Sequence, residues 1–370
     1  MGAREKAALS KVVDSGWITM GERVRAFELA FAQAHEMADS VAVSSCTAAL
    51  HLIVHALGIG PGDEVLVPSM TFVATSNAVL YTGATPVFVD IESPDMPVMS
   101  IQDAEAKSNS RTKAVILMHY AGYLVNRDAW RDFARRRNLL IIEDAAHAAG
   151  HPLAGSFGIA AAFSFYGNKN MTTAEGGAIL SNDPGLLERT RQMRGHGMTS
   201  GTHQRVTSRT PDYDVTMLGF NYRLDEFRGA VGLVQVRQLR KWNNARARLS
   251  ALYRSLIAER CPWLTVPFTA RTPSAHHIMP IVLPRTSHRQ FVIDELRRQE
   301  IQTTVHYPPV HRLSFYRSLV PALRLPHTED FARRELTVPL HPQMNAGSVA
   351  AVVDALAAAA APHHPIQEVG

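Results

Sequence analysis

The sequence predicts an α/β fold in which a mixed, mostly parallel seven-stranded sheet is flanked by helices and followed by a smaller C-terminal α+β domain. Three observations lead to this prediction. Within residues 40–182, short β-rich apolar runs alternate with longer helical stretches, the pattern of parallel strands joined by helices. A long helical segment then runs from about Asp225 to Arg260. From Ala275 onward, mixed strand and helix patterns indicate a second domain.

The candidate strands of the sheet are residues 40–45, 64–69, 86–91, 113–119, 139–144, 161–167 and 176–182. The Gly- and Pro-containing residues 58–64 end one helix and give the following strand a clear start. We assign residues 1–235 to a large domain that includes N-terminal helices, and residues 236–370 to the small domain with the long connecting helix. The alanine-rich residues 352–361 predict a terminal helix, and residues 362–370 a frayed tail.

Composition limits the class of protein. The chain has 370 residues, of which 46% are apolar and 19% charged, and this is ordinary for a globular protein. Two cysteines, Cys46 and Cys261, are too few for a disulfide framework or a structural zinc site, so we expect a reducing compartment and no metal. The first residues are charged and no apolar run is long enough to cross a bilayer, so we expect a cytoplasmic protein with no membrane partner.

The net charge of +5 favours an anionic partner, but the basic residues are spread along the chain. The densest group, Arg131–Arg137, reads as a solvated helix face rather than a nucleic-acid contact. We therefore expect no nucleic-acid partner. Phosphate groups on a small substrate would suit the charge equally well.

Asp144 ends the candidate strand LLIIED, which places it at the carboxyl edge of the sheet, where open α/β sheets bind ligands. A carboxylate there can pair with the pyridine nitrogen of pyridoxal phosphate and keep that nitrogen protonated, which makes the ring an electron sink. It can equally cap a following turn. His147 could pair with the ring hydroxyl or line the same site.

Lys169 lies in a turn after the next strand, within FSFYGNKNMTTAEGG. A lone lysine in a turn is usually a surface residue. Partial burial beside a cationic cofactor would lower its pKa and make the amine a nucleophile.

The third element is SSCTAAL, residues 44–50, where a strand gives way to a helix. The free N–H groups of a helix start, together with the hydroxyls of Ser45 and Thr47, suit a phosphate. The alternative is an ordinary Ser/Thr cap. Ser164, which alternates with two phenylalanines on its strand, could add a hydroxyl to the same phosphate.

In this order and spacing, these segments resemble the DegT/DnrJ/StrS family of sugar aminotransferases, which are pyridoxal-phosphate enzymes of the aspartate aminotransferase fold type I. The resemblance covers nearly the whole chain. Its motifs are SGWITMG, SSCTAAL, GIGPGDEVLVPSMTFVATSNAVLYTGATPVFVDIE, MHYAG, EDAAHA, FSFYGNKNMTTAEGG, GFNYRLDEFRGAVGLVQ, VHYPPVH and TVPLHP.

The resemblance implies that Lys169 is the catalytic Schiff-base lysine and that Asp144 pairs with the pyridine nitrogen. It assigns the remaining cofactor contacts to His147 at the ring hydroxyl, Phe72 stacked on the ring, Cys46, Thr47 and Ser164 at the phosphate, and Asn221 reaching the phosphate from the neighbouring subunit of an obligate homodimer. Tyr123, His306 and Tyr307 are candidate contacts of the sugar nucleotide, and each could equally be structural.

The activity implied by the resemblance is transfer of an amino group from L-glutamate to a nucleotide-diphosphate keto sugar. The motifs SSCTAA, HYAG, EDAAHA and AEGG resemble the branch that acts on carbon 4 of a keto-6-deoxyhexose, and carbon 3 is the alternative. A sugar dehydratase of the same family would carry histidine in place of Lys169. A catalytically silent binding protein on the same fold is a further alternative.

Overall fold

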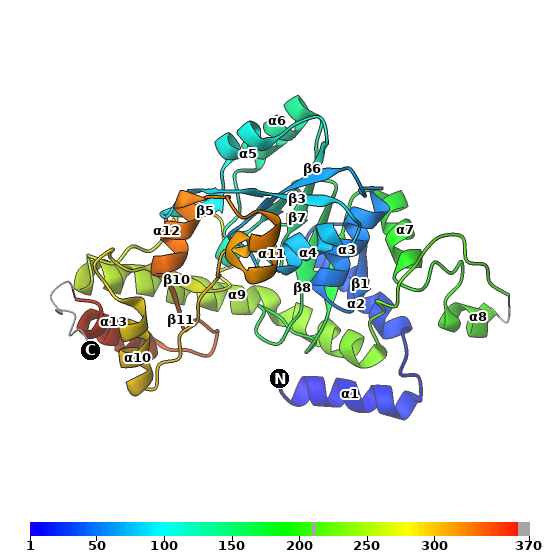
Figure 1. Cartoon of the computed structure of the whole chain (residues 1–370). Helices are drawn as coiled ribbons and strands as arrows, with labels where there is room; N and C mark the ends of the chain where they lie inside the picture. The colour runs from blue at the N-terminus through cyan, green and yellow to red at the C-terminus, as the bar shows by residue number, and fades with distance from the viewer. Residues whose placement is uncertain (209–211, 362–370) are drawn as a thin grey trace.

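The computed structural model describes residues 1–208 and 212–361 and contains one seven-stranded sheet at its centre (Figure 1). Its strands are β1 (Ser40–Val43), β2 (Glu64–Pro68), β3 (Thr85–Val89), β6 (Thr112–Met118), β7 (Leu140–Asp144), β8 (Ala160–Ser164) and β9 (Gly177–Leu180). All seven candidate strands are thereby confirmed. The strand order is β1-β9-β8-β7-β6-β2-β3.

The sheet is mostly parallel, as predicted. β9 is antiparallel to both of its neighbours, β1 and β8, while the other adjacent strands are parallel. The carboxyl ends of β7 and β8 therefore lie at the same edge of the sheet. Asp144 ends β7, and the turn with Lys169 follows β8 at this edge.

Helices cover both faces of the sheet. On one face lie α3 (Cys46–Ala56), α4 (Ala74–Leu80) and α7 (Pro184–Met193), and on the other lie α2 (Glu22–Ala34), α5 (Ile101–Lys107), α6 (Arg127–Arg137) and α9 (Glu226–Arg260). In β8, Phe163 packs in the core under α2 and Ala162 in the core under α3, because successive side chains of a strand point to opposite faces.

The buried carboxylate of Glu226 fixes α2 against α9. It accepts hydrogen bonds from the backbone N–H groups of Gly21, Arg23 and Val24, at 3.0, 3.0 and 2.9 Å. These N–H groups begin α2 and have no acceptor within that helix. A Cβ at Gly229 would lie 2.8 Å from the backbone nitrogen of Val24, so the helices approach too closely for a larger residue.

The C-terminal part has its own core and a two-stranded antiparallel sheet of β10 (Met279–Val282) and β11 (Glu335–Val338). The second half of α9, α10 (Arg289–Arg298) and α13 (Ala346–Ala359) pack around it. The predicted long helix and terminal helix are both confirmed. The proposed domain boundary at residue 235 falls inside α9, and the predicted tail 362–370 lies outside the described residues.

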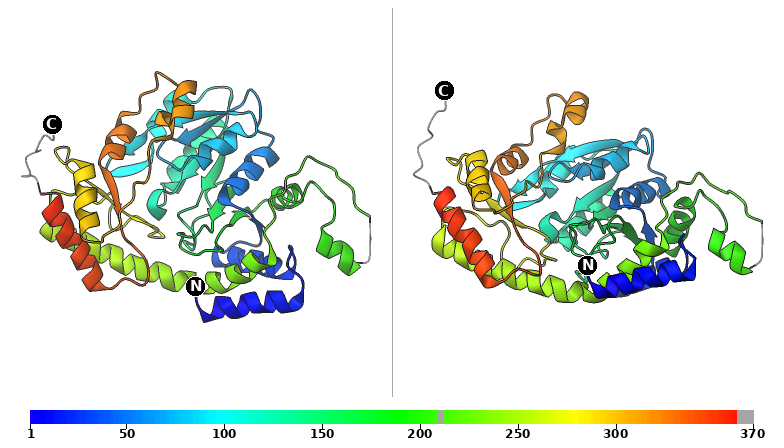
Figure 2. Two further views of the ribbon diagram at one scale, coloured as in Figure 1. Left: turned by 60° about the horizontal axis from the view of Figure 1, so that its bottom comes forward. Right: turned by 90° about the horizontal axis from the view of Figure 1, so that it is seen from below.

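The remaining elements are short connections apart from the first helix. They are α1 (Ala3–Ser15), β4 (Ile91–Ser93), β5 (Met96–Met99), η1 (Tyr120–Gly122), α8 (Thr202–Ser208), η2 (Val310–Arg312), α11 (Ser314–Leu319) and α12 (Pro326–Arg334). α9 runs along one side of the molecule between α1 and α13 (Figure 2). The segment that carries α8 projects from the body (Figure 1).

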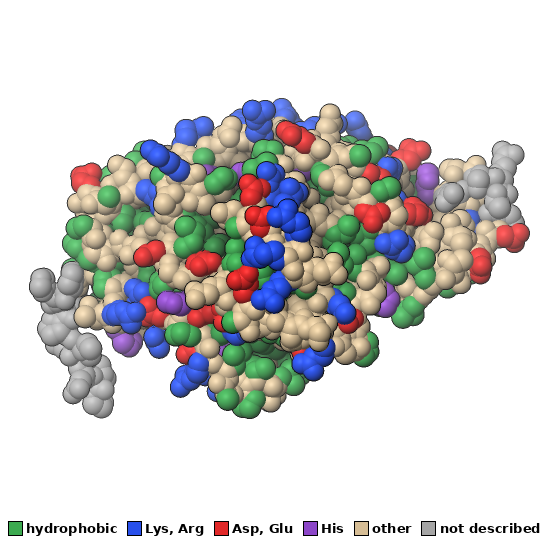
Figure 3. All heavy atoms as spheres, turned by 90° about the horizontal axis from the view of Figure 1, so that it is seen from above, with side chains coloured by type: hydrophobic (Ala, Val, Ile, Leu, Met, Phe, Trp, Pro, Cys, Tyr) green, Lys and Arg blue, Asp and Glu red, His purple; other side chains and the backbone are tan. Residues whose placement is uncertain are grey.

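The surface supports the interpretation of Arg131–Arg137 as a solvated helix face. On the face that carries α5 and α6, basic side chains lie among acidic ones (Figure 3). Arg135 pairs with Asp132 at 2.8 Å, and Arg136 pairs with Glu105 at 2.5 Å. Within residues 1–208 and 212–361, no helix is long and apolar enough to cross a membrane.

Candidate active site

Asp144 is buried at the carboxyl end of β7. Its Oδ2 accepts a hydrogen bond of 2.6 Å from the Thr75 hydroxyl, and its Oδ1 accepts one of 3.2 Å from the Ala146 N–H. Burial raises the pKa of Asp144 more than these two bonds and the nearby Lys169 lower it. The two hydrogen bonds and Lys169 favour the ionised carboxylate, whose negative charge would raise the basicity of a bound ring nitrogen and so keep that nitrogen protonated.

Lys169 is only partly exposed, in the turn that follows β8. Its backbone N–H donates to the Tyr166 carbonyl at 3.0 Å, which fixes the turn. Burial lowers the pKa of the Lys169 amine to about 8, although the nearby Asp144 and Cys46 act to raise it. Lys169, Asp144 and Cys46, three predicted site residues, therefore lie close enough to interact. The lowered pKa makes the Lys169 amine available as a nucleophile near neutral pH.

The helix start predicted for phosphate lies beside this group. The Ser45 hydroxyl accepts from the Ala48 N–H at 3.1 Å, so it serves as the ordinary cap that we held as the alternative. Cys46 and Thr47 are the first residues of α3, so their backbone N–H groups have no hydrogen-bond acceptor within the helix. Burial, with the nearby Asp144, raises the pKa of the Cys46 thiol well above its ordinary value, so the thiol is neutral and does not repel an anion.

Ser164 lies one strand away from the start of α3. It pairs with Gly177 of β9, and a Cβ at Gly177 would lie 2.5 Å from the Ser45 carbonyl carbon. The flanking residues Phe163 and Phe165 pack on the opposite face of the sheet. By alternation, the Ser164 hydroxyl faces the α3 side.

His147 is buried and in contact with Tyr307. Its Nε2 lies 2.8 Å from the Tyr307 hydroxyl, and its ring lies 4.3 Å from that of His277. Burial and the charge of Lys169 hold the pKa of His147 well below its ordinary value, so the ring is neutral. Its buried Nδ1 has no hydrogen-bond partner among the described residues.

Phe72 and Tyr307 form one wall of the site, with ring centroids 6.0 Å apart. Phe72 is 57% exposed, so it is not the core phenylalanine that its sequence alone would suggest. His306 precedes Tyr307, and its ring lies 6.3 Å from that of His147. The charge of Lys169 also acts on His306.

Two predicted residues stand apart from this group. Tyr123 is buried, stacked on Phe268 at 4.1 Å, and its hydroxyl accepts from Arg254 at 2.9 Å, so these contacts give it a packing role. Asn221 is exposed on the segment that leads back to the body from α8. Its neighbours Phe220 and Tyr222 pack on His51 of α3.

Several residues near the site were missed by sequence reasoning. The Thr75 hydroxyl donates a hydrogen bond to Asp144. The Asn170 side chain accepts from His277 and donates to Asn243, at 2.9 Å in each case. The second threonine of TFVAT, one helical turn after Phe72, was a signal that could have found Thr75. His277 has no such signal, because only the tertiary fold brings it to Lys169.

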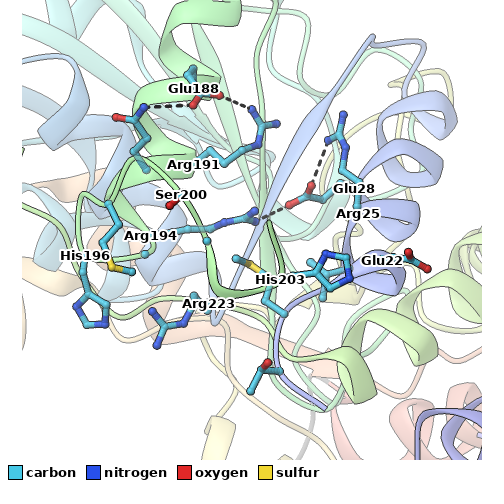
Figure 4. A pocket seen from close by; sticks show the side chains of 18 of the residues that line it. Glu22, Arg25, Glu28, Glu188, Arg191, Arg194, His196, Ser200, His203 and Arg223 are labelled. Atoms are coloured by element: carbon cyan, nitrogen blue, oxygen red, sulfur yellow. Dashed lines mark hydrogen bonds and ion pairs between the residues drawn. The ribbon is translucent and has the colours of Figure 1, made fainter. Parts of the chain in front are cut away.

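A cavity of about 1000 Å³ lies away from these residues, between α2 and residues 195–203 (Figure 4). It is lined by charged side chains. Arg194 and Glu28 form a buried ion pair there, and the Ala42 N–H donates to the same Glu28 carboxylate at 2.9 Å. The cavity contains none of the predicted cofactor residues.

The profile of the DegT/DnrJ/EryC1/StrS aminotransferase family matches residues 1–357. The chain belongs to this family. PseC from Helicobacter pylori, an aminotransferase involved in the biosynthesis of pseudoaminic acid, is 28% identical, with a TM-score of 0.90 over 97% of each chain. DesV from S. venezuelae, solved with a ketimine intermediate, is 36% identical, with a TM-score of 0.87 over 96% of this chain and 94% of its own.

DesI, solved in the presence of its TDP-sugar product, is 31% identical, with a TM-score of 0.86 over 97% of this chain and 90% of DesI. Other similar structures hold the cofactor as PLP or PMP. The resemblance found in the sequence and the fold type I architecture are therefore confirmed. The protein is a pyridoxal-phosphate-dependent sugar aminotransferase.

The residues present fit this cofactor. Asp144 supplies a buried base, the first turn of α3 supplies free N–H groups for phosphate, and Lys169 supplies an amine with a lowered pKa. The unpartnered Nδ1 of His147 is a buried polar atom that a bound group would satisfy.

Proposed function

We propose that this protein transfers an amino group from L-glutamate to a nucleotide-diphosphate 4-keto-6-deoxy sugar, giving a 4-amino sugar. The observation that carries the proposal is the convergence of Lys169, Asp144 and Cys46 at the carboxyl edge of the sheet. L-Glutamate gives up its amino group and leaves as 2-oxoglutarate before the keto sugar enters. When bound, pyridoxal phosphate supplies an electron sink that stabilises negative charge on the substrate carbon.

Each site residue has its own role in this proposal. Lys169 would hold the cofactor covalently, and its amine would move the proton at the substrate carbon because it remains within reach of that carbon. Asp144, supported by Thr75, holds the proton on the pyridine nitrogen. Cys46, Thr47 and Ser164 would bind the phosphate. This role is supported by the place of Cys46 and Thr47 at the start of α3 and of Ser164 at the end of β8, on the side that faces α3.

Other side chains would hold the cofactor ring. Phe72 would stack on it, and His147 would pair with its hydroxyl. His306 and Tyr307 are the contacts that we retain for the sugar nucleotide, while Tyr123 is left out because its hydroxyl and ring are already engaged in the fold.

We also propose a homodimer in which Asn221 of one subunit reaches the phosphate bound by the other. Phe220 and Tyr222 are stacked at 5.2 Å and face α3 of their own subunit, so alternation directs Asn221 away from it. The projecting segment also exposes large apolar side chains, and Leu218 is 69% exposed. A second copy would cover this surface.

The nucleotide-sugar substrate is supported by DesI, whose structure contains a TDP-sugar product. Carbon 3 is the alternative position. A sugar dehydratase is disfavoured by Lys169, since the dehydrating branch of the family carries histidine there.

The test begins with colour. Purified protein should be yellow, and L-glutamate should shift its visible absorbance. Borohydride should fix the cofactor to the protein but not to a Lys169→Ala variant. dTDP-, UDP- and GDP-linked keto sugars are then screened, and NMR assigns the aminated carbon. A protein that stays colourless with added pyridoxal phosphate would refute the proposal, and amination only at carbon 3 would correct it.

A further inference from the structure

The backbone of His306 is fixed on both sides by buried side chains. Its N–H donates to Oε2 of Glu335 at 2.9 Å, and its carbonyl accepts from the Tyr120 hydroxyl at 2.7 Å. Its ring contacts the fold through Nδ1, which lies 2.9 Å from the Thr337 hydroxyl and 3.4 Å from the Thr304 hydroxyl. Nε2 has no hydrogen-bond partner in the described part of the chain, and the residue is partly exposed, so this nitrogen is available to a ligand.

The Thr337 hydroxyl has a second partner. It lies 2.5 Å from Oε1 of Glu335, in addition to its contact with Nδ1 of His306. A hydroxyl has one proton, so it can donate to only one of these two atoms and must accept from the other. The three groups therefore form a chain whose direction depends on which end supplies a proton.

Two arrangements satisfy every atom of this chain. When Oε1 of Glu335 is protonated, it donates to Thr337, Thr337 donates to Nδ1 of His306, and the ring carries its proton on Nε2. When Oε1 loses its proton to solvent, the Thr337 hydroxyl turns to donate to it and accepts from Nδ1–H. The ring proton has then moved from Nε2 to Nδ1 through water, and the charge of the ring is unchanged.

We propose that Glu335 and Thr337 form a relay that selects the tautomer of His306, and thereby decides whether Nε2 offers a ligand a donor or an acceptor. The relay requires a neutral ring, and the surroundings supply this. Burial, followed by the charge of Lys169, lowers the pKa of His306 to about 4. His147 and His277, which interact with it, are neutral for the same reasons.

The surroundings of Glu335 set the pH at which the relay reverses. Burial raises its pKa to about 8, while Thr337, the His306 N–H, Arg289 of α10 and the neighbouring Tyr120 lower it. Tyr307 also interacts with this carboxyl, and burial raises its own pKa so that it remains neutral. Near pH 7 the carboxyl is therefore mostly protonated, and Nε2 of His306 is a donor.

A donor at Nε2 suits an oxygen acceptor of the substrate, which in a keto-sugar nucleotide is the keto oxygen, a hydroxyl or a diphosphate oxygen. This consequence for binding rests on the proposed function. The tautomer itself does not, because Glu335, Thr337 and His306 are all present in the protein without substrate. Glu335 and Thr337 are positioning residues, since they act through His306.

The test measures the tautomer directly. The full-length protein is labelled with ¹⁵N in its histidine rings, and two-bond ¹H–¹⁵N correlations are recorded between about pH 6 and about pH 10, a range that begins below the ordinary histidine pKa of about 6.5. The signals of His306 are identified by their loss in His306→Gln. In the wild type, the protonated nitrogen should change from Nε2 to Nδ1 with a midpoint near pH 8.

Three variants decide the outcome. Glu335→Gln should hold Nε2–H at every pH, because its amide N–H donates to Thr337 as the neutral carboxyl does. Thr337→Val should remove the step, and it also covers the case in which Glu335→Gln fails to fold. Thr304→Val is the matched control and should keep the step. The Thr304 hydroxyl lies farther from the same Nδ1, at 3.4 Å against 2.9 Å for Thr337, and only the Thr337 hydroxyl also contacts Glu335.

A single tautomer throughout in the wild type, or a step that survives in Thr337→Val, would overturn the relay. A measurement of keto-sugar amination distinguishes failure of the relay from failure of the proposed function. If the step is present and no keto sugar is aminated, the relay stands and the proposed function fails.

Discussion

Gly177→Ala is the most direct test of how the sheet places the start of α3. A methyl group there would lie 2.5 Å from the Ser45 carbonyl carbon and 2.6 Å from the Cys46 nitrogen, where ordinary contact begins at 3.4 Å. Both atoms belong to the backbone, so the start of α3 must move by about 0.9 Å, the difference between 3.4 and 2.5 Å. Overpacking of this kind costs about 1–3 kcal/mol.

The same displacement moves the N–H groups of Cys46 and Thr47, to which we assign the phosphate. If binding requires them to return, the affinity for pyridoxal phosphate should fall roughly 5- to 150-fold. The assay is a titration of the apo-protein followed by visible absorbance, with the thermal midpoint measured in parallel. Gly60→Ala is the control, because its nearest contact would be an ordinary 3.5 Å. Wild-type affinity and midpoint in Gly177→Ala would refute the reasoning.

Three further predictions concern buried charges and the nucleophile. Arg194→Met should destabilise the protein by roughly 1.5–3 kcal/mol in denaturant unfolding, because the buried Glu28 carboxylate loses one of its two arginine partners and keeps only Arg25, at 3.1 Å, and adding Glu28→Gln should recover part of that loss; equal stability of the single and double variants would contradict this. The rate at which cofactor attaches to Lys169 should rise with pH and level off above about 8, since burial lowers the pKa of the amine, and a rise that continues to pH 10 would contradict this. Thr75→Val should cost roughly 1.5–3 kcal/mol, and Thr75→Ser much less. Because the Thr75 bond lowers the pKa of Asp144, it favours the ionised form, so the loss should increase as the pH is raised through the titration of Asp144, and a loss that does not change with pH would argue against an ionised partner.

The sheet could be predicted because each strand is a short apolar run bounded by turn residues. That pattern also placed Asp144 and Lys169 at one edge, since both follow adjacent parallel strands. The predicted strand 86–91 was less accurate at its end. The chain leaves the sheet after Val89, and Ile91 pairs instead with Met99 in the β4–β5 hairpin.

The supporting residues of the site could not be predicted in the same way. His277 and Glu335 lie more than a hundred positions after Asp144 in the sequence, and only the tertiary packing of the C-terminal part brings His277 to His147 and Glu335 to His306. Tyr123 illustrates the opposite difficulty. Its motif suggested a substrate contact, but the stacking partner Phe268 and the donor Arg254 come from distant segments and engage both its ring and its hydroxyl.

The long helix α9 has a consequence for how the protein can move. It is a continuous helix of 35 residues, about 52 Å long at 1.5 Å per residue, and contains no proline. Its first half packs on α2 and its second half on α13. Rotation of the C-terminal part against the sheet would therefore have to bend a continuous helix that contains no proline. We expect the two domains to keep one orientation through the catalytic cycle, so that substrate exchange depends on side chains at the rim of the site, with Phe72 among them.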